Sequence, residues 1–230
     1  MSQLLLAVDT SGKNGSVTLA RVTAGRAEVE IVETVSLAGG TFSAQLIPQV
    51  SALLAKNGYA KSELTAFAAV SGPGSFTGLR VGLAAIKALA EILQKPIAAV
   101  SLLEAIAQSG RTRGRVLAAL DAGRGEAYVG DYDVSGGEQA PPRMQQERLL
   151  GREEFLTEAK GKHVVTPDAT LAEVLQAVGI WCERIAYPGS AVVARLGWQR
   201  IQRGETIRPE DLEANYIRRS DAEIFSQPKS

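Results

Sequence analysis

The chain repeats one strand-and-turn pattern in each half. In the first half, the apolar run LLLAV ends at Asp9, and a glycine-bearing turn leads into the alternating segment 15–19. In the second half, the run VLAAL ends at Asp121, and a similar turn leads into the segment 126–130. An apolar run closed by a turn and followed by a second strand predicts a hairpin. The repetition of this hairpin indicates two lobes of related design.

The segment between the two repeats sets the expected boundary between the lobes. Residues 108–114 are rich in glycine and arginine, which is typical of a surface loop. We therefore expect an N-terminal lobe over residues 1–108 and a smaller C-terminal lobe with a tail over residues 109–230. A chain of 230 residues is long enough to bury roughly 70% of its unfolded surface on folding.

Hydrophobic periodicity predicts the elements around these hairpins. Alternating or continuous apolar runs predict further strands over residues 27–36, 66–70 and 96–100 and near 164–165. Apolar residues at helical spacing predict helices over residues 42–54, 76–93 and 191–202, and others that begin at 101 and 171. Strands that alternate with helices in this way are typical of the α/β class.

The composition limits the kinds of partner and cellular compartment that suit the chain. Twenty-five basic residues balance twenty-five acidic ones, so the chain lacks the net positive charge of a protein that binds nucleic acid on charge alone. A local basic cluster at 111–115 and another at 218–219 are typical of solvated loops. The single cysteine, Cys182, cannot form an intramolecular disulfide. No apolar run approaches the ~20 residues of a membrane span. We expect a cytoplasmic protein with no membrane partner.

The segment SGPGSFTGLRVGL, residues 71–83, runs from a glycine-rich loop into a helix. The loop lacks the lysine of a P-loop, and Pro73 removes one backbone donor, which disfavours a phosphate cradle. The helix over residues 76–93 is apolar over an arc of roughly 240°, whereas a helix packed on one sheet needs little more than 100°. Either another part of the chain or a second chain must cover the rest.

These segments resemble the TsaB (YeaZ) family. The resemblance rests on residues 71–83, on LLLAVDTS, TFSAQLIPQV and VLAALDAGRGEAYVGDYD, and on the ending 215–218, and it covers nearly the whole chain. It implies an α/β, actin-like (ASKHA) fold of two ribonuclease-H-like lobes, the second lobe reduced. It also implies a role in making threonylcarbamoyladenosine (t6A) beside the tRNA anticodon. In that pathway TsaC makes threonylcarbamoyl-adenylate, TsaD, a paralogue of TsaB, transfers the group, and TsaE is an ATPase.

The resemblance further implies a non-catalytic scaffold that activates TsaD. The expected partners are TsaD in a heterodimer, TsaE in a ternary complex and a second copy of the chain in a homodimer, and tRNA would be reached only indirectly through the complex. The helices from Phe42 and Phe76 would form the partner interface. The expected interface residues are Phe42, Leu46, Val50, Phe76, Gly78, Val81, Gly82, Ala85 and Leu89.

A catalytic alternative rests on the two repeated aspartates. Asp9, Ser11 and Asp121 stand where kinases of this fold hold phosphate and Mg²⁺, so an ATPase or small kinase is the alternative function. An aspartate after a strand also caps its own turn through the backbone, and we favour that role. The nucleotide site would then be vestigial. We expect no tightly bound cofactor, and weak binding of ATP, ADP or Mg²⁺ only in the complex.

A metallopeptidase is the less favoured alternative. TsaD-like proteins bind a metal through two histidines on their first helix, whereas the corresponding segment 42–54 has none. The single histidine, His163, lies far away in the sequence, and a zinc site needs at least three protein ligands. We therefore expect no metal site. A serine triad is disfavoured for the same reason, because Ser71 and Ser75 have no other histidine to act as the base.

Overall fold

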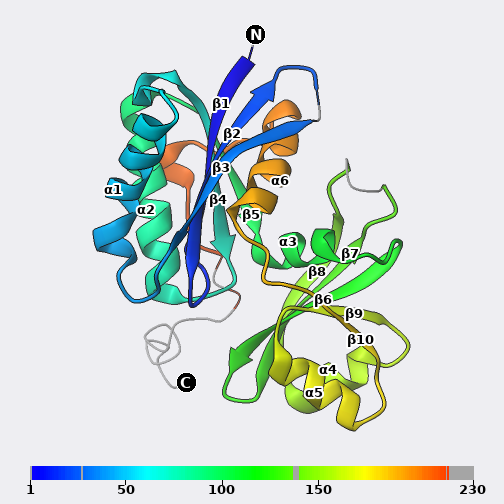
Figure 1. Ribbon diagram of the computed structural model, residues 1–230. Helices are drawn as coiled ribbons and strands as arrows, with labels where there is room; N and C mark the ends of the chain where they lie inside the picture. The colour runs from blue at the N-terminus through cyan, green and yellow to red at the C-terminus, as the bar shows by residue number, and fades with distance from the viewer. Residues whose placement is uncertain (1, 27, 137–139, 216, 218–230) are drawn as a thin grey trace, which may run out of the picture.

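Two five-stranded sheets form the framework of the molecule (Figure 1). The structure is a computed structural model, and it describes residues 2–26, 28–136, 140–215 and 217. The first sheet has the order β3-β2-β1-β4-β5 and the second has the order β10-β9-β6-β7-β8. The strands of the first sheet are β1 (Ser2–Asp9), β2 (Gly15–Thr23), β3 (Val29–Leu37), β4 (Leu64–Gly72) and β5 (Ile97–Ser101). Those of the second are β6 (Arg115–Gly123), β7 (Glu126–Asp133), β8 (Arg143–Gly151), β9 (His163–Thr166) and β10 (Cys182–Arg184).

The two sheets repeat one topology. In each, three consecutive antiparallel strands begin the lobe. A fourth strand then adds in parallel beside the first, and a fifth adds in parallel beside the fourth. The predicted hairpins are therefore confirmed as β1–β2 and β6–β7, at equivalent places in the two sheets. The second sheet is the smaller one, because its added strands have only four and three residues.

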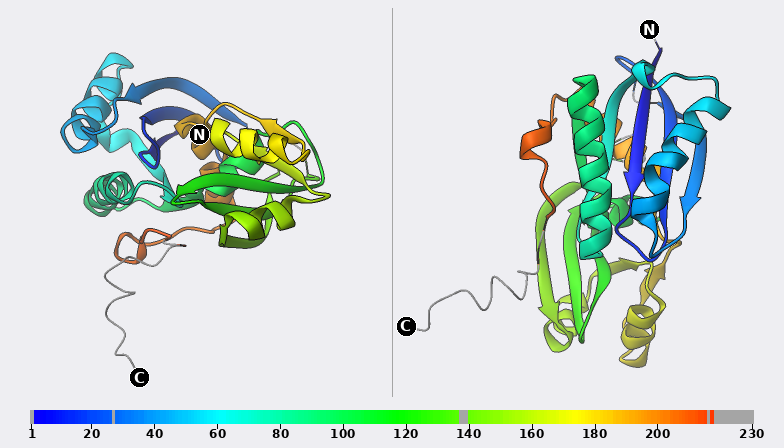
Figure 2. Two further views of the ribbon diagram at one scale, coloured as in Figure 1. Left: turned by 90° about the horizontal axis from the view of Figure 1, so that it is seen from below. Right: turned by 90° about the vertical axis from the view of Figure 1, so that its left-hand side faces the viewer.

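Six α-helices cover these sheets. They are α1 (Phe42–Lys56), α2 (Phe76–Leu93), α3 (Leu102–Ser109), α4 (Arg152–Ala159), α5 (Ala169–Ala177) and α6 (Ser190–Gln202) among the described residues. Helices α1 and α2 lie side by side on the outer face of the first sheet (Figure 2). Helix α6 packs on its other face, and α3 contacts strands of both sheets. Helices α4 and α5 cover the second sheet.

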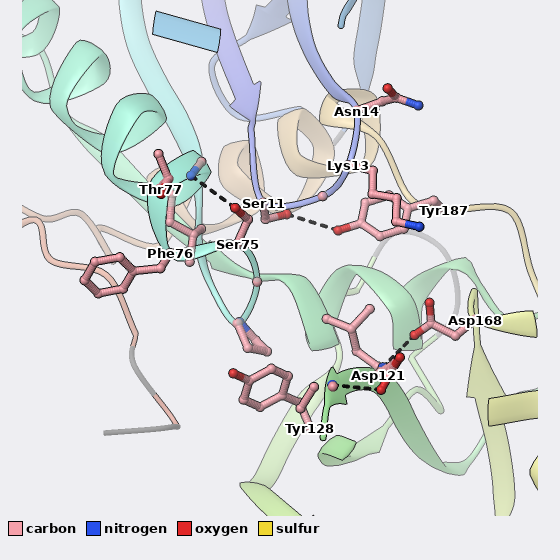
Figure 3. A pocket seen from close by; sticks show the side chains of 18 of the residues that line it. Ser11, Lys13, Asn14, Ser75, Phe76, Thr77, Asp121, Tyr128, Asp168 and Tyr187 are labelled. Atoms are coloured by element: carbon pink, nitrogen blue, oxygen red, sulfur yellow. Dashed lines mark hydrogen bonds between the residues drawn. The ribbon is translucent and has the colours of Figure 1, made fainter. Parts of the chain in front are cut away.

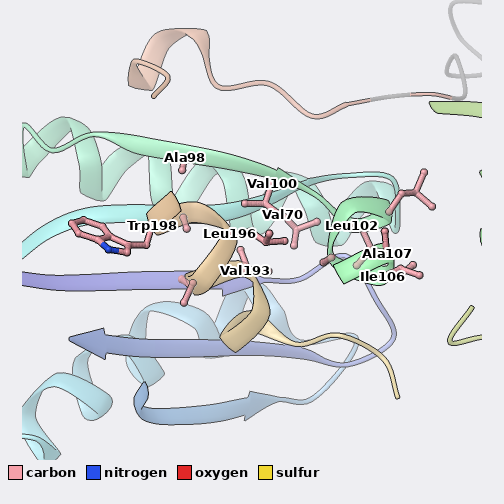
Figure 4. Packing of buried hydrophobic residues seen from close by; sticks show 14 of the residues in the cluster. Val70, Ala98, Val100, Leu102, Ile106, Ala107, Val193, Leu196 and Trp198 are labelled. Carbon is pink, nitrogen blue, oxygen red and sulfur yellow. The ribbon is translucent and has the colours of Figure 1, made fainter. Parts of the chain in front are cut away.

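Helix α6 belongs to the second half of the sequence but packs on the first sheet, against β1, β2, β4 and β5. Gly197 permits this approach, because a Cβ added there would lie 2.4 Å from the Cβ of Ala68. Trp198 is 2% exposed in the same layer (Figure 4), where its indole N–H donates to the carbonyl oxygen of Arg26 at 2.8 Å. The α6 segment is thus part of the core of the first lobe. The boundary between residues 1–108 and 109–230 stays a prediction for the rest of the chain.

Three of these strands and α-helices were not predicted from the sequence. Strand β8 has no fully buried residue, and its sequence RMQQERLLG shows no alternation of apolar and polar residues. Helix α4 buries only Phe155 and Ala159, and β10 has three residues. Each owes its position to the neighbouring strand or sheet rather than to a periodic apolar pattern.

Candidate functional site: the cleft between the lobes and the outer face of α1 and α2

A cleft of about 1290 Å³ lies where the two hairpin turns face each other (Figure 3). The turn after β1 contributes Ser11 to Asn14, and the end of β6 with the residue after it contributes Asp121 to Arg124. The loop from Pro73 and the first turn of α2 complete one wall. The repeated strands place the two turns opposite each other, because each turn follows the first strand of its own sheet.

Asp9 caps its own turn and does not line the cleft. Its Oδ1 accepts hydrogen bonds from the backbone N–H of Ser11 at 2.9 Å and from the Ser11 hydroxyl at 2.5 Å. The side chain is buried, and this burial raises the pKa of the Asp9 carboxyl to about 6, although the bonds from Ser11 oppose the rise. The carboxylate is therefore engaged with the backbone, as the turn-capping interpretation requires.

Asp121 caps the equivalent turn of the second lobe. Its Oδ1 accepts a hydrogen bond of 2.8 Å from the backbone N–H of Gly123. Its own backbone N–H donates to Oδ2 of Asp168 at 2.6 Å. Burial raises the pKa of the Asp168 carboxyl, while the hydrogen bond from Asp121 lowers it. Asp168 lines the cleft but was not found from the sequence, where its only signal is its place just before helix α5.

Tyr187 forms another wall of the cleft that sequence analysis missed. Its hydroxyl lies 3.2 Å from the Ser11 hydroxyl, which in turn contacts Asp9. Burial raises the pKa of Tyr187. A Cβ at Gly12 would lie 3.0 Å from the Tyr187 ring, so Gly12 makes room for the tyrosine. The residue comes from the loop before α6, and nothing in its local sequence points to the cleft.

The glycine-rich loop packs against the end of β1 in the same chain. The backbone N–H of Ser75 donates to the carbonyl oxygen of Ser11 at 2.7 Å. A Cβ at Gly74 would lie 2.6 Å from that same oxygen. The Ser75 hydroxyl caps α2 by accepting from the backbone N–H of Gly78 at 3.3 Å. The loop therefore needs its small residues for close backbone approach within the chain.

The two glycines of α2 also face inward, which corrects their expected place at the partner interface. A Cβ at Gly78 would lie 2.1 Å from the carbonyl oxygen of Thr10, and one at Gly82 would lie 2.2 Å from its Oγ1. Both glycines are buried. They permit close approach between α2 and the chain's own β1 end, so they provide no exposed stripe for a second helix.

The expected interface residues of α1 need the same correction. Phe42, Leu46 and Val50 are 7%, 1% and 5% exposed and belong to the core between α1 and the first sheet. A second chain could not reach them without unpacking that core. Of the residues expected on α2, Phe76 is 43% exposed, and Val81, Ala85 and Leu89 are half-buried.

A different set of apolar residues is exposed on these two helices. Ile92 is 75% exposed and Ile47 is 46% exposed, and Ala84 and Ala88 are also exposed. Phe76 lies at the edge of the cleft, and the guanidinium carbon of Arg80 lies 3.7 Å from the centre of its ring. We call Ile47, Phe76, Ala84, Ala88 and Ile92 the α1–α2 face. An exposed apolar face of this kind is typical of a protein–protein contact.

Metal ligands do not converge in the part of the chain that the structure describes. No group of three or more His, Cys, Asp or Glu side chains there could hold a metal ion. His163 lies at the start of β9, where its Nε2 contacts Thr112 and Glu183. None of the described helices is long and apolar enough to cross a membrane.

Comparison with known proteins identifies the family. Residues 36–153, about half of the chain, match the family model "TsaD: tRNA N6-adenosine threonylcarbamoyltransferase". The "tRNA threonylcarbamoyladenosine biosynthesis protein TsaB" of Escherichia coli is 28% identical over 95% of this chain and 96% of that protein. The chain belongs to the TsaB (YeaZ) family. The protein of the same name from Bacillus subtilis is 36% identical over 60% of this chain and 59% of its own length.

Solved structures agree with this membership of the TsaB family. YeaZ from Pseudomonas aeruginosa has a TM-score of 0.76 and 28% identity, and the match covers 93% of this chain and 99% of that one. The predicted fold is thereby confirmed as an actin-like α/β fold of two ribonuclease-H-like lobes.

Proposed function

We propose that this TsaB-family chain is a non-catalytic scaffold that activates TsaD in forming t6A beside the tRNA anticodon, in the cytoplasm. A part in t6A biosynthesis follows from the names of the relatives. The observation that carries the scaffold role is the α1–α2 face, because Ile47 and Ile92 expose aliphatic surface that no other described part of the chain covers. Removing a fully exposed aliphatic side chain from water contributes about 1.5–3 kcal/mol to an association.

The match to the TsaD family model supports a paralogous partner. The matched residues, 36–153, contain α1, α2 and the sheet on which they pack. A TsaD-type protein is therefore expected to present an equivalent pair of helices. Two such pairs can form a four-helix bundle about a pseudo-twofold axis, as isologous dimers do. A homodimer would use the same face, and TsaE would join the heterodimer to form a ternary complex.

The geometry of the aspartates supports the non-catalytic role. The Asp9 carboxylate is buried and binds its own turn, and the exposed carboxylate of Asp121 binds its own turn in the second lobe. The loop of residues 72–78 contains no lysine that could hold a phosphate. We expect ATP, ADP or Mg²⁺ to bind weakly and only in the complex.

Reconstitution tests the proposal. A mixture of TsaC, TsaD and TsaE with tRNA, threonine, bicarbonate and ATP should form t6A only when this chain is added. The double variant Ile47→Glu, Ile92→Glu should lose this effect, because it places two charges in the contact. Val178→Glu is the matched control, since Val178 is also exposed but lies after α5 in the other lobe.

The same assay separates the scaffold from an ATPase or kinase that uses Asp9 and Asp121. The scaffold role requires Asp121→Ala to keep most of the activity, because the side chain only shapes a turn. If Asp121→Ala is inactive while the Ile47 and Ile92 double variant works at the normal rate, the chemistry lies in this chain.

A further inference from the structure

The turn after β1 is covered at its beginning and exposed further along. Asp9 and Ser11 are 2% and 3% exposed, whereas Lys13 and Asn14 of the same turn are exposed. Ser11 nevertheless belongs to the wall of a cleft of about 1290 Å³, which is large enough to hold a small-molecule ligand. The Asp9–Ser11 pair is thus kept from the cleft by other parts of the chain.

Tyr187 supplies most of this cover on the side of the cleft. Its hydroxyl lies 3.2 Å from the Ser11 hydroxyl, and a Cβ at Gly12 would lie 3.0 Å from its Cζ and from its hydroxyl oxygen (Figure 3). The glycine-rich loop covers the other side of Ser11, since a Cβ at Gly74 would lie 2.8 Å from the Cβ of Ser11. Tyr187 itself is 39% exposed, so its outer side faces the cleft. Removing its ring would open Ser11 and Gly12 to the cleft.

The loop that carries Tyr187 is fixed to both lobes. On the side of β10, the backbone N–H of Ile185 donates to the carbonyl oxygen of the last residue of β9 at 3.1 Å. On the side of α6, the backbone N–H of Ser190 donates to a serine hydroxyl of β2 at 2.9 Å. Pro188 is buried, and a proline restricts the backbone of the residue before it to extended conformations. The ring is therefore held over the turn.

The groups beneath this cover suit a magnesium ion that carries a phosphate. The Asp9 carboxylate would repel a bare anion, but Mg²⁺ is commonly bound by one or two carboxylates together with water and phosphate oxygens. Lys13, exposed on the same turn, adds a positive charge in the cleft for the phosphates. A magnesium-bound phosphate chain is therefore the class of ligand that these side chains fit.

We propose that Tyr187 is a built-in plug, which keeps a magnesium-bound phosphate chain away from Asp9 and Ser11. The ring and its hydroxyl occupy the space over Ser11 and Gly12 that such a ligand needs. The inference rests on the non-catalytic role proposed above, and it adds to that role a named residue that suppresses nucleotide binding. A smaller side chain at position 187 should restore binding without any other change.

The experiment measures ligand binding by the full chain alone. Calorimetry is carried out with inorganic triphosphate and with ATP, each with and without Mg²⁺, on wild type, Tyr187→Phe, Tyr187→Val and Tyr187→Ala. A hydrogen bond to a charged group contributes roughly ten- to 150-fold in affinity, so Tyr187→Ala should gain about tenfold or more with Mg²⁺. Tyr187→Val should gain less. Tyr187→Phe should bind as weakly as wild type, because its ring still covers Gly12.

Tyr128→Ala is the matched control. Tyr128 also lines the cleft, but it belongs to β7 in the second lobe. Its removal widens the cleft without uncovering Ser11, so the affinity should stay at the wild-type level. Asp9→Asn added to Tyr187→Ala should abolish the gain, because asparagine has no charge to hold Mg²⁺. Thermal unfolding shows which variants are folded, and Tyr187→Val provides the test if Tyr187→Ala does not fold.

Three outcomes would overturn the proposal. They are equal affinities of wild type, Tyr187→Val and Tyr187→Ala for triphosphate with Mg²⁺, a gain that Tyr128→Ala shares, and a gain that persists without Mg²⁺ or with Asp9→Asn. None of these readouts uses TsaD or t6A formation. A failure of the scaffold role in reconstitution would therefore leave the effect of Tyr187 intact, and the two failures are distinguishable.

Discussion

The Thr10 hydroxyl donates a hydrogen bond of 2.7 Å to the backbone carbonyl oxygen of Gly78. This bond joins the residue after β1 to the first turn of α2, and it is buried. Gly82, one turn further along α2, lies over the same threonine. The glycine spacing of α2 thus permits the close contact with Thr10 inside the chain, although the same spacing is also typical of helix pairs.

Gly82→Ala should destabilise the fold. Its Cβ would lie 2.2 Å from Thr10 Oγ1, so either the Thr10–Gly78 bond breaks or α2 moves. Overpacking of this kind costs about 1–3 kcal/mol, against which alanine recovers up to ~1 kcal/mol of helix propensity. Urea unfolding measures the difference. Ala84→Ser, exposed on the same helix, should stay within about 0.5 kcal/mol of wild type. Equal stability of Gly82→Ala and wild type would show that the close approach is not limiting.

Ile92→Glu should convert a homodimer of the purified chain into a monomer without loss of stability. Ile92 is 75% exposed in the single chain, so glutamate is tolerated there, but burying its charge in a dimer is costly. Light scattering gives the mass, and Val178→Glu serves as the exposed control. A dimer mass that persists in Ile92→Glu and in Ile47→Glu would exclude the α1–α2 face as the interface.

The pKa of Asp9 should make stability depend on pH in one window. Burial raises this pKa from 3.8 to about 6, so between these values the folded chain keeps a proton that the unfolded chain has lost. Asp9 therefore contributes stability below about pH 4, and this contribution is lost as the pH rises through about 6. A shift of this size corresponds to about 2–3 kcal/mol.

Asp9→Asn tests this dependence, because asparagine stays neutral and can still accept the bonds from Ser11. The free energy of unfolding of the variant minus that of wild type should be larger at pH 7.5 than at pH 4.5. Taking the difference between the two proteins removes the titration of the other groups. A difference that is the same at both pH values would mean that Asp9 is not protonated in this window.

The chain alone should bind ATP at most very weakly and hydrolyse it negligibly. The cleft offers Lys13 and Arg124, but Asp9 is turned into its own hairpin and Asp121 is bound to Gly123. Calorimetry with ATP and Mg²⁺ measures the affinity of wild type, Asp9→Ala and Asp121→Ala. Micromolar binding that both substitutions abolish would favour the kinase-like alternative.

The purified chain should carry no stoichiometric transition metal and cleave no peptide bond. A metallopeptidase needs three protein ligands for zinc, and His163 instead contacts Thr112 and Glu183. Elemental analysis and a peptidase assay with and without chelator test this. A content near one zinc per chain, or cleavage that the chelator stops, would contradict the prediction.

Local patterns in the sequence were sufficient to predict the framework of this protein. The two hairpins, the helix over residues 76–93 and the cap at Ser101 all lie where periodicity and turn chemistry placed them. Such features depend on residues within one or two turns of each other, so a sequence encodes them directly. The turn-capping role of Asp9 and Asp121 is of the same kind, because each carboxylate binds a backbone amide two residues away.

Contacts between distant segments were decided only by the tertiary structure. The apolar arc of α2 showed that a second part of the structure must cover this helix. It did not show whether Thr10, the α1 helix or another chain would do so. The fold assigned Gly78 and Gly82 to Thr10, brought Asp168 to Asp121, and returned α6 to the first sheet. Each pairing joins residues far apart in the chain, and apolar surface is non-directional, so a helix face shows how much must be buried and not against what.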